Sequence, residues 1–109
     1  MADLKPFGLP PFTYQTLCAE LARYPEIERA VVFGSRAMGN YRPGSDVDIC
    51  LFGPEVTLKL AWHVHARLNE ELPIPYFFDV LAFDHISSQE LRAQIEQFGQ
   101  ELYRAGIAA

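Results

Sequence analysis

Residues 30–52 read AVVFGSRAMGNYRPGSDVDICLF, which places an apolar run, a glycine–serine pair and two aspartates in close succession. The run that ends at Phe33 is β-branched and apolar, which is typical of a buried strand, and it stops abruptly at Gly34. Glycine, asparagine and proline then recur through residues 34–45 and indicate a loop. A second strand is predicted from Asp46 onward, because apolar residues return there and continue until another Gly-Pro pair.

Helical patterns flank these two strands. One helix face is predicted from the spacing of Tyr14, Leu17, Cys18 and Leu21. A second helix, with Thr57 as its cap, is predicted from the spacing of Leu60, Ala61, Val64 and Leu68. The aromatic-rich run from Tyr76 to Phe83 predicts a third strand.

The end of the chain predicts one more helix. Its start is indicated by a capping box at residues 87–90, and Gly106 is a natural stop. Its apolar face would comprise Leu91, Ile95, Phe98 and Leu102. The whole order predicts an α/β (α+β) domain with one small sheet flanked by helices. The strand directions stay open, because the loop between the first two strands permits either.

Length and composition limit the organisation of the chain and the partners it can have. The 109 residues suit one domain at 12–109, preceded by an irregular N-terminal arm at 1–11. Fourteen acidic residues against nine basic ones give a net charge of −5, which disfavours bulk nucleic acid as a partner. The sequence has neither a signal peptide nor an apolar stretch long enough to span a membrane, so we expect a cytoplasmic protein. Cys18 and Cys50 are predicted to be buried thiols rather than a disulfide.

The glycine–serine pair suits phosphate binding. Backbone N–H groups at a strand end, together with the Ser35 hydroxyl, can donate to phosphate oxygens, and Gly34 allows a close approach. Arg36 and Arg42 could add positive charge there. We therefore predict Gly34, Ser35 and Arg36 as nucleotide-binding residues, with a solvated surface position as the alternative for Arg36.

Asp46 and Asp48 suit a metal ion. They are two apart in a strand, so their side chains leave the same face about 7 Å apart. Hard oxygen ligands of this kind select Mg²⁺ or Mn²⁺. Asp79, the only charge in an apolar strand, is the candidate third carboxylate of a two-metal in-line displacement. A structural ion pair with Arg29 or Arg36 is its alternative reading.

Other reactive or aromatic side chains have plainer interpretations. His63 and His65 are two apart in a helix and point away from each other, so they do not suit a zinc pair. Trp62, Phe77 and Phe78 are interpreted as core or interface aromatics rather than platforms on which bases stack.

The glycine–serine loop and the three aspartates resemble the motifs of a known family. Residues 32–39 and 45–49 resemble the signature of the nucleotidyltransferase superfamily, and residues 78–81 resemble its third acidic strand. The length is similar to that of the minimal nucleotidyltransferases (MNT proteins), which include antitoxins encoded beside HEPN-domain ribonuclease toxins. Met38 departs from the pattern, since many relatives place a basic residue there.

The resemblance implies a polymerase-β-like fold with a small mixed sheet of about three to four strands. It implies that Gly34 and Ser35 contact the nucleotide and that Asp46, Asp48 and Asp79 are the catalytic metal ligands for two Mg²⁺ ions, or Mn²⁺. The implied reaction is AMP transfer from ATP to a tyrosine of a HEPN toxin, which would be held in a hetero-oligomer. Two other functions stay open: an antitoxin that neutralises its partner by binding alone, and a nucleotidyltransferase that acts on a small-molecule hydroxyl.

Overall fold

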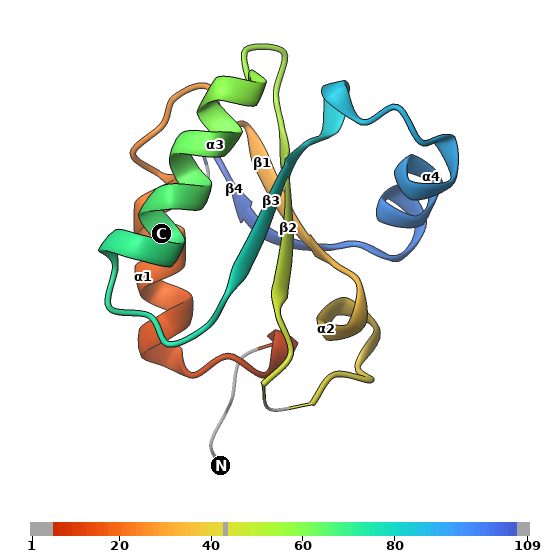
Figure 1. Cartoon of the computed structure of the whole chain (residues 1–109). Helices are drawn as coiled ribbons and strands as arrows, with labels where there is room; N and C mark the ends of the chain where they lie inside the picture. The colour runs from red at the N-terminus through yellow and green to blue at the C-terminus, as the bar shows by residue number, and fades with distance from the viewer. Residues whose placement is uncertain (1–5, 43, 107–109) are drawn as a thin grey trace.

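The two strands predicted around the glycine–serine loop lie side by side at the centre of a four-stranded sheet (Figure 1). The computed structural model describes residues 6–42 and 44–106. In it β1 (Arg29–Phe33) pairs antiparallel with β2 (Val47–Phe52). On the far side of β2, β3 (Phe78–Ala82) pairs in parallel, while β4 (Gln100–Arg104) pairs antiparallel with β1. The order β3-β2-β1-β4 confirms a mixed sheet and leaves β3 and β4 as its edges.

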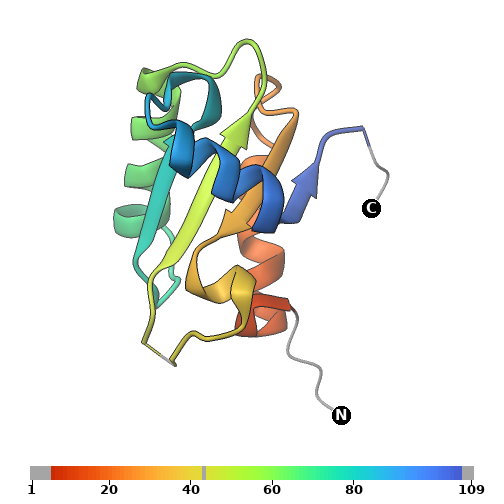
Figure 2. The ribbon, with the colours of Figure 1, turned by 90° about the vertical axis from the view of Figure 1, so that its right-hand side faces the viewer.

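Helices cover both faces of the sheet (Figure 2). On one face lie α1 (Pro11–Leu21) and α3 (Leu58–Ala66), and on the other lies α4 (Gln89–Phe98) (Figure 1). The shorter helical elements are η1 (Pro6–Gly8), α2 (Ser35–Met38), the π-helical turn η2 (Arg67–Glu71) and η3 (Phe83–His85). Within the described residues, none of the helices is both long and apolar enough to cross a membrane.

Alternation along β2 divides the core into two clusters. Val47, Ile49 and Leu51 are fully buried in the cluster under α1 and α3, while Cys50 belongs to the cluster under α4. Both cysteines are free thiols, with Cys50 buried and Cys18 half-buried. Burial raises the pKa of the Cys50 thiol to about 12, so this group remains a neutral, apolar core side chain.

The prediction for the end of the chain was wrong in one respect. The helix ends at Phe98, and the following residues, including Leu102, form β4 instead of another helical turn. Gly99 explains the change, because a Cβ there would lie only 2.4 Å from the Ile95 carbonyl oxygen and 2.4 Å from Val31 Cγ1. The chain therefore passes close against β1 at Gly99 and continues by pairing with it, which buries Leu102 under α1.

The helix starts are set by local side chains. Thr57 caps α3 by accepting a hydrogen bond from the Leu60 N–H, as predicted. The cap of α4 is Ser88, which accepts from the Leu91 N–H, one position later than in the predicted capping box. Of the predicted N-terminal arm, residues 1–5 lie outside the described residues, η1 is a 3₁₀ turn and Pro11 is the first residue of α1.

Candidate functional site

The three predicted carboxylates lie at one end of the sheet. Asp46 immediately precedes β2, Asp48 is the second residue of β2 and Asp79 is the second residue of β3. In the parallel pairing of these strands Asp48 lies directly opposite Asp79. On its other side Asp48 pairs with Phe33, the last residue of β1. Phe33, Asp48 and Asp79 therefore lie side by side in one row across β1, β2 and β3.

The Asp48 carboxyl group is electrostatically perturbed. It is half-buried, and burial raises its pKa, with further increases from the negative charges of Asp79 and then Asp46. The three groups thus act on one another electrostatically across the row. A cation placed here would relieve both the repulsion and the burial penalty.

Asp79 is the exposed residue of an otherwise apolar strand. Phe78, Val80 and Ala82 of the same edge strand are buried, whereas the Asp79 side chain is exposed on the opposite face. Asp79 makes no ion pair within the part of the chain that the structure describes. The structure therefore does not support the alternative reading of Asp79 as half of a structural ion pair.

Gly34 lies against the Asp48 carboxylate. Its backbone angles, φ 76° and ψ −152°, belong to a region that is essentially restricted to glycine. A Cβ at this position would lie 2.5 Å from Asp48 Oδ2. The backbone that leads into α2 is therefore held directly beside the carboxylate, and half-buried Ser35 follows as the first residue of α2.

We predict that Gly34→Ala impairs the AMP transfer that the family resemblance implies more than it impairs folding. The new methyl group displaces the end of the Asp48 side chain, and misplacing a reacting group by about 1 Å costs about a hundredfold in rate. The backbone strain costs about 1–3 kcal/mol. The matched control is Gly39→Ala: Gly39 also has a positive φ, of 84°, but a Cβ there meets nothing within 4 Å. Transfer rates and urea unfolding of both variants test this, and equal rates would contradict it.

Arg36 is buried rather than on the surface. Its side chain is only 3% exposed, with Nη1 donating to the Phe7 carbonyl at 2.7 Å and Nη2 to the Ser45 carbonyl at 3.0 Å. The guanidinium also lies over the rings of Tyr41 and Tyr76, at 4.8 and 5.2 Å from their centroids. This burial overturns the alternative of a solvated surface position, and nucleotide binding by Arg36 stays a prediction. Arg36 connects the loop that precedes Asp46 to the N-terminal segment. Arg42, the other arginine of this loop, is exposed.

The donor chemistry of the site fits a magnesium ion that is shared with a nucleotide. Among the described residues, no three histidine, cysteine, aspartate or glutamate side chains are gathered into a closed ligand set. Mg²⁺ does not require such a set, since it is commonly held by one or two carboxylates, with substrate phosphates and water completing the shell. Asp48 and Asp79, adjacent on neighbouring strands, can supply these carboxylates.

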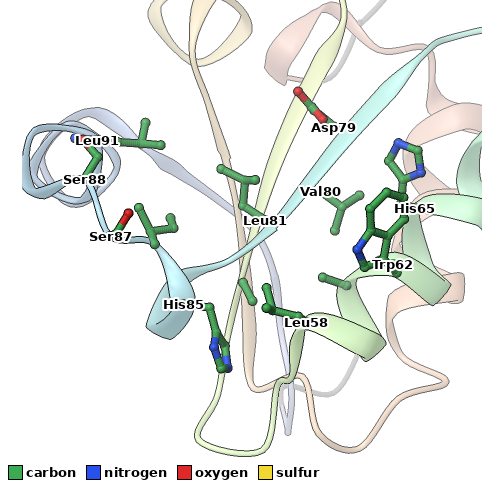
Figure 3. A pocket seen from close by; sticks show the side chains of 13 residues that line it. Leu58, Trp62, His65, Asp79, Val80, Leu81, His85, Ser87, Ser88 and Leu91 are labelled. Carbon is green, nitrogen blue, oxygen red and sulfur yellow. Dashed lines mark hydrogen bonds between the residues drawn. The ribbon is translucent and has the colours of Figure 1, made fainter.

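Asp79 also lines a groove that sequence reasoning did not find. The groove has a volume of about 490 Å³ and runs along the outer edge of β3, between α3 and the start of α4 (Figure 3). Trp62, predicted as a core or interface aromatic, is 71% exposed on its α3 wall, and His65 lies beside it. Phe78 is fully buried, whereas Phe77 is exposed. No sequence spacing links these segments, because the sheet and two separate helices bring them together.

Comparison with known proteins places the chain in a family. The family described as Polymerase beta, Nucleotidyltransferase matches residues 15–106, and no curated protein matches the chain by sequence. The fold is similar to a chain in the crystal structure of a toxin–antitoxin with AMP-PNP, at a TM-score of 0.65 and 20% identity, covering 87% of this chain and 73% of that one.

Two further structures share the fold. One contains a tri-AMPylated Shewanella oneidensis HEPN toxin in complex with an MNT antitoxin (TM-score 0.62, 19% identity, 85% and 71% covered). The other is a putative nucleotidyltransferase from Sulfolobus solfataricus (TM-score 0.56, 20% identity, 86% and 79% covered). The match over most of its length shows that the chain belongs to the polymerase beta nucleotidyltransferase family, as its resemblance predicted.

Proposed function

We propose that this chain transfers AMP from ATP, with magnesium, to a tyrosine hydroxyl of a HEPN-domain toxin and thereby acts as its antitoxin. The observation that carries the proposal is the row formed by Asp48, Asp79 and the end of β1, with Gly34 packed against the Asp48 carboxylate. Membership of the nucleotidyltransferase family supports the transfer. The partner and the nucleotide are suggested by folds shared with a toxin–antitoxin that holds AMP-PNP and with the complex of an AMPylated HEPN toxin.

In this proposal each residue at this end of the sheet has a distinct task. Gly34 and Ser35 bind the phosphates of the nucleotide, and Asp46, Asp48 and Asp79 would hold magnesium beside them. Asp79 is exposed at the sheet edge, where an acceptor can reach it, and it orients the incoming hydroxyl. Arg36 acts indirectly, since its bonds to backbone carbonyls stabilise the loop that carries Asp46.

The reaction is an in-line displacement at the α-phosphorus of ATP. The acceptor oxygen forms a bond to that phosphorus, and the bond from the phosphorus to the oxygen that bridges to the β-phosphate breaks. Pyrophosphate leaves, and the hydroxyl proton passes to Asp79 and then to water. A magnesium ion held by these aspartates would supply charge neutralisation for the triphosphate and would favour loss of the acceptor proton.

The test is the intact mass of a co-expressed HEPN toxin after incubation with the chain, ATP and magnesium. We expect mass gains in steps of one AMP, and no gain with the variant Asp46→Ala/Asp48→Ala. Asp84→Ala is the matched control, because Asp84 is an exposed acid just past the other end of β3. It should transfer at the rate of the wild type.

The outcomes separate the alternatives. A toxin that gains no mass but is still silenced in a stable complex would replace this proposal with an antitoxin that acts by binding. A toxin that is neither modified nor bound would leave transfer to a small-molecule hydroxyl as the remaining candidate function.

A further inference from the structure

The groove along β3 continues directly from the candidate catalytic row. Asp79 belongs to both, and from it the groove follows β3 toward Leu58 and His85 (Figure 3). An occupant of the groove therefore touches the carboxylate that the proposed function assigns to the acceptor. The inference below rests on that proposed function and specifies how the acceptor is held.

The outer edge of β3 offers backbone groups for strand pairing. In its register with β2, the N–H and C=O groups of Phe78, Val80 and Ala82 point away from the sheet. The Asn69 side chain takes up those of Phe78, since its amide oxygen accepts from the Phe78 N–H at 2.7 Å and its nitrogen donates to the Phe78 carbonyl at 2.9 Å. The Asn69 side chain thus occupies the outward backbone groups at one end of this edge, so an added strand cannot pair with Phe78. The stretch from Val80 onward faces the groove.

The two walls of the groove suit alternating side chains. The α3 wall presents Leu58 and Trp62, which are 56% and 71% exposed. The wall on the side of α4, which we call the α4 wall, consists of Asp79 and Leu81 from β3 and Leu91 from α4. Successive side chains of a strand point to opposite faces, so an added strand would place every second residue on the α3 wall and the others on the α4 wall.

The charge of the groove indicates the character of its occupant. Among the described lining residues Asp79 is the one carboxylate, and none is lysine or arginine. Asp79 in turn lies beside Asp48 and Asp46 in a chain of net charge −5. A neutral or basic segment is therefore favoured, and an acidic one is repelled.

We propose that the acceptor polypeptide binds as an extended strand added to the edge of β3. Its hydroxyl side chain faces Asp79, and the residues on either side of it are apolar and contact Trp62 and Leu58. Main-chain hydrogen bonds at Val80 supply affinity. The two walls, which contact alternate side chains of the added strand, select the sequence of the acceptor. The acceptor is thus recognised by its pattern: a tyrosine flanked by apolar residues, with basic residues further out.

The probe is the peptide acetyl-Lys-Arg-Val-Tyr-Val-Ile-Lys-amide, together with a counterpart in which phenylalanine replaces tyrosine. We expect both peptides to slow amide hydrogen exchange at Val80 and to shift the Trp62 indole resonance in spectra of the ¹⁵N-labelled chain. With ATP and magnesium, only the tyrosine peptide should gain AMP. Trp62→Ala should weaken binding of both peptides about tenfold or more. Phe98→Ala removes another exposed aromatic, 47% exposed and outside the groove, and should leave binding unchanged.

Three results would overturn the assignment: no binding of either peptide, AMP transfer without protection of Val80, or equal affinity in Trp62→Ala and the wild type. Binding of ATP with magnesium is measured separately by calorimetry on the same sample. If the peptides protect Val80 but the nucleotide does not bind, the proposed function fails while the strand-addition site stands.

Discussion

Replacing Asp48 with asparagine is expected to lower AMP transfer about a thousandfold while making the metal-free folded chain more stable. The loss of activity follows because a carboxylate that holds magnesium contributes several kcal/mol to the stabilisation of the transition state. The gain in stability follows from the raised pKa of Asp48, which means that folding disfavours the charged form. Asparagine has nearly the same shape and carries no charge.

The gain should depend on pH in a defined direction. A carboxyl group whose pKa is higher in the folded state than in the unfolded state lowers stability at neutral pH, where it must be charged in both states. The stability advantage of Asp48→Asn is therefore present at pH 7 and vanishes in acid, where the wild-type carboxyl is protonated. Urea unfolding in a chelating buffer at pH 7 and at acidic pH measures it. Asp84→Asn is the control for a general charge effect, and a destabilised Asp48→Asn would contradict the electrostatic account of the row.

Glu20→Gln is expected to destabilise the fold by about 3 kcal/mol, because it breaks a buried ionic cluster. The Glu20 side chain is 4% exposed, and Arg67 donates to both of its oxygens at 2.8 Å. The Tyr24 hydroxyl donates to Oε2 at 2.6 Å, and Arg23 adds a longer contact. This cluster ties α1 to the segment that follows α3, so its loss loosens the contact between the two helices on that face of the sheet.

The same carboxylate predicts an acid-sensitive fold. Hydrogen bonding from Arg67 is the main cause that lowers the pKa of Glu20 to about 2. A group whose pKa is depressed by folding stabilises the protein above its unfolded value, near 4.5, and that stability is lost as the pH falls toward 2. Unfolding free energies across this window should fall for the wild type and change much less for Glu20→Gln. The exposed pair between Arg104 and Glu101 provides the control, and Glu101→Gln should leave stability nearly unchanged.

Much of the fold and of the candidate site could be predicted, because the relevant signals are short-range. The strands around residues 34–45, the division of Val47 and Cys50 between opposite faces, and the Thr57 cap all follow from patterns within a few residues. The assignment of Asp46, Asp48 and Asp79 to one metal site came from combining this spacing with the family resemblance. The residues proposed for metal and nucleotide binding remain predictions until the variants above are measured.

The errors have a common physical origin in contacts between distant segments. The run that contains Leu102 has no strong local preference against a helix, but pairing with β1 and the close approach at Gly99 outweigh helical continuation. The alternative of a solvated surface position for Arg36 is wrong, because the tertiary structure buries its guanidinium against two carbonyls and two rings. Asp79 could be identified as an isolated charge, but its exposure depends on which face of β3 the helices cover.

Local sequence patterns were enough to specify the elements around the glycine–serine loop, the two faces of β2 and the carboxylates available for chemistry. These properties depend on periodicity and on backbone preferences, which act between near neighbours. Packing between distant segments was needed for four other features: the formation of β4, the placement of Asp79 opposite Asp48, the pairing of Glu20 with Arg67 and the groove along β3. Each of these depends on which distant segments pack together, and that choice minimises the free energy of the whole chain rather than of any one segment.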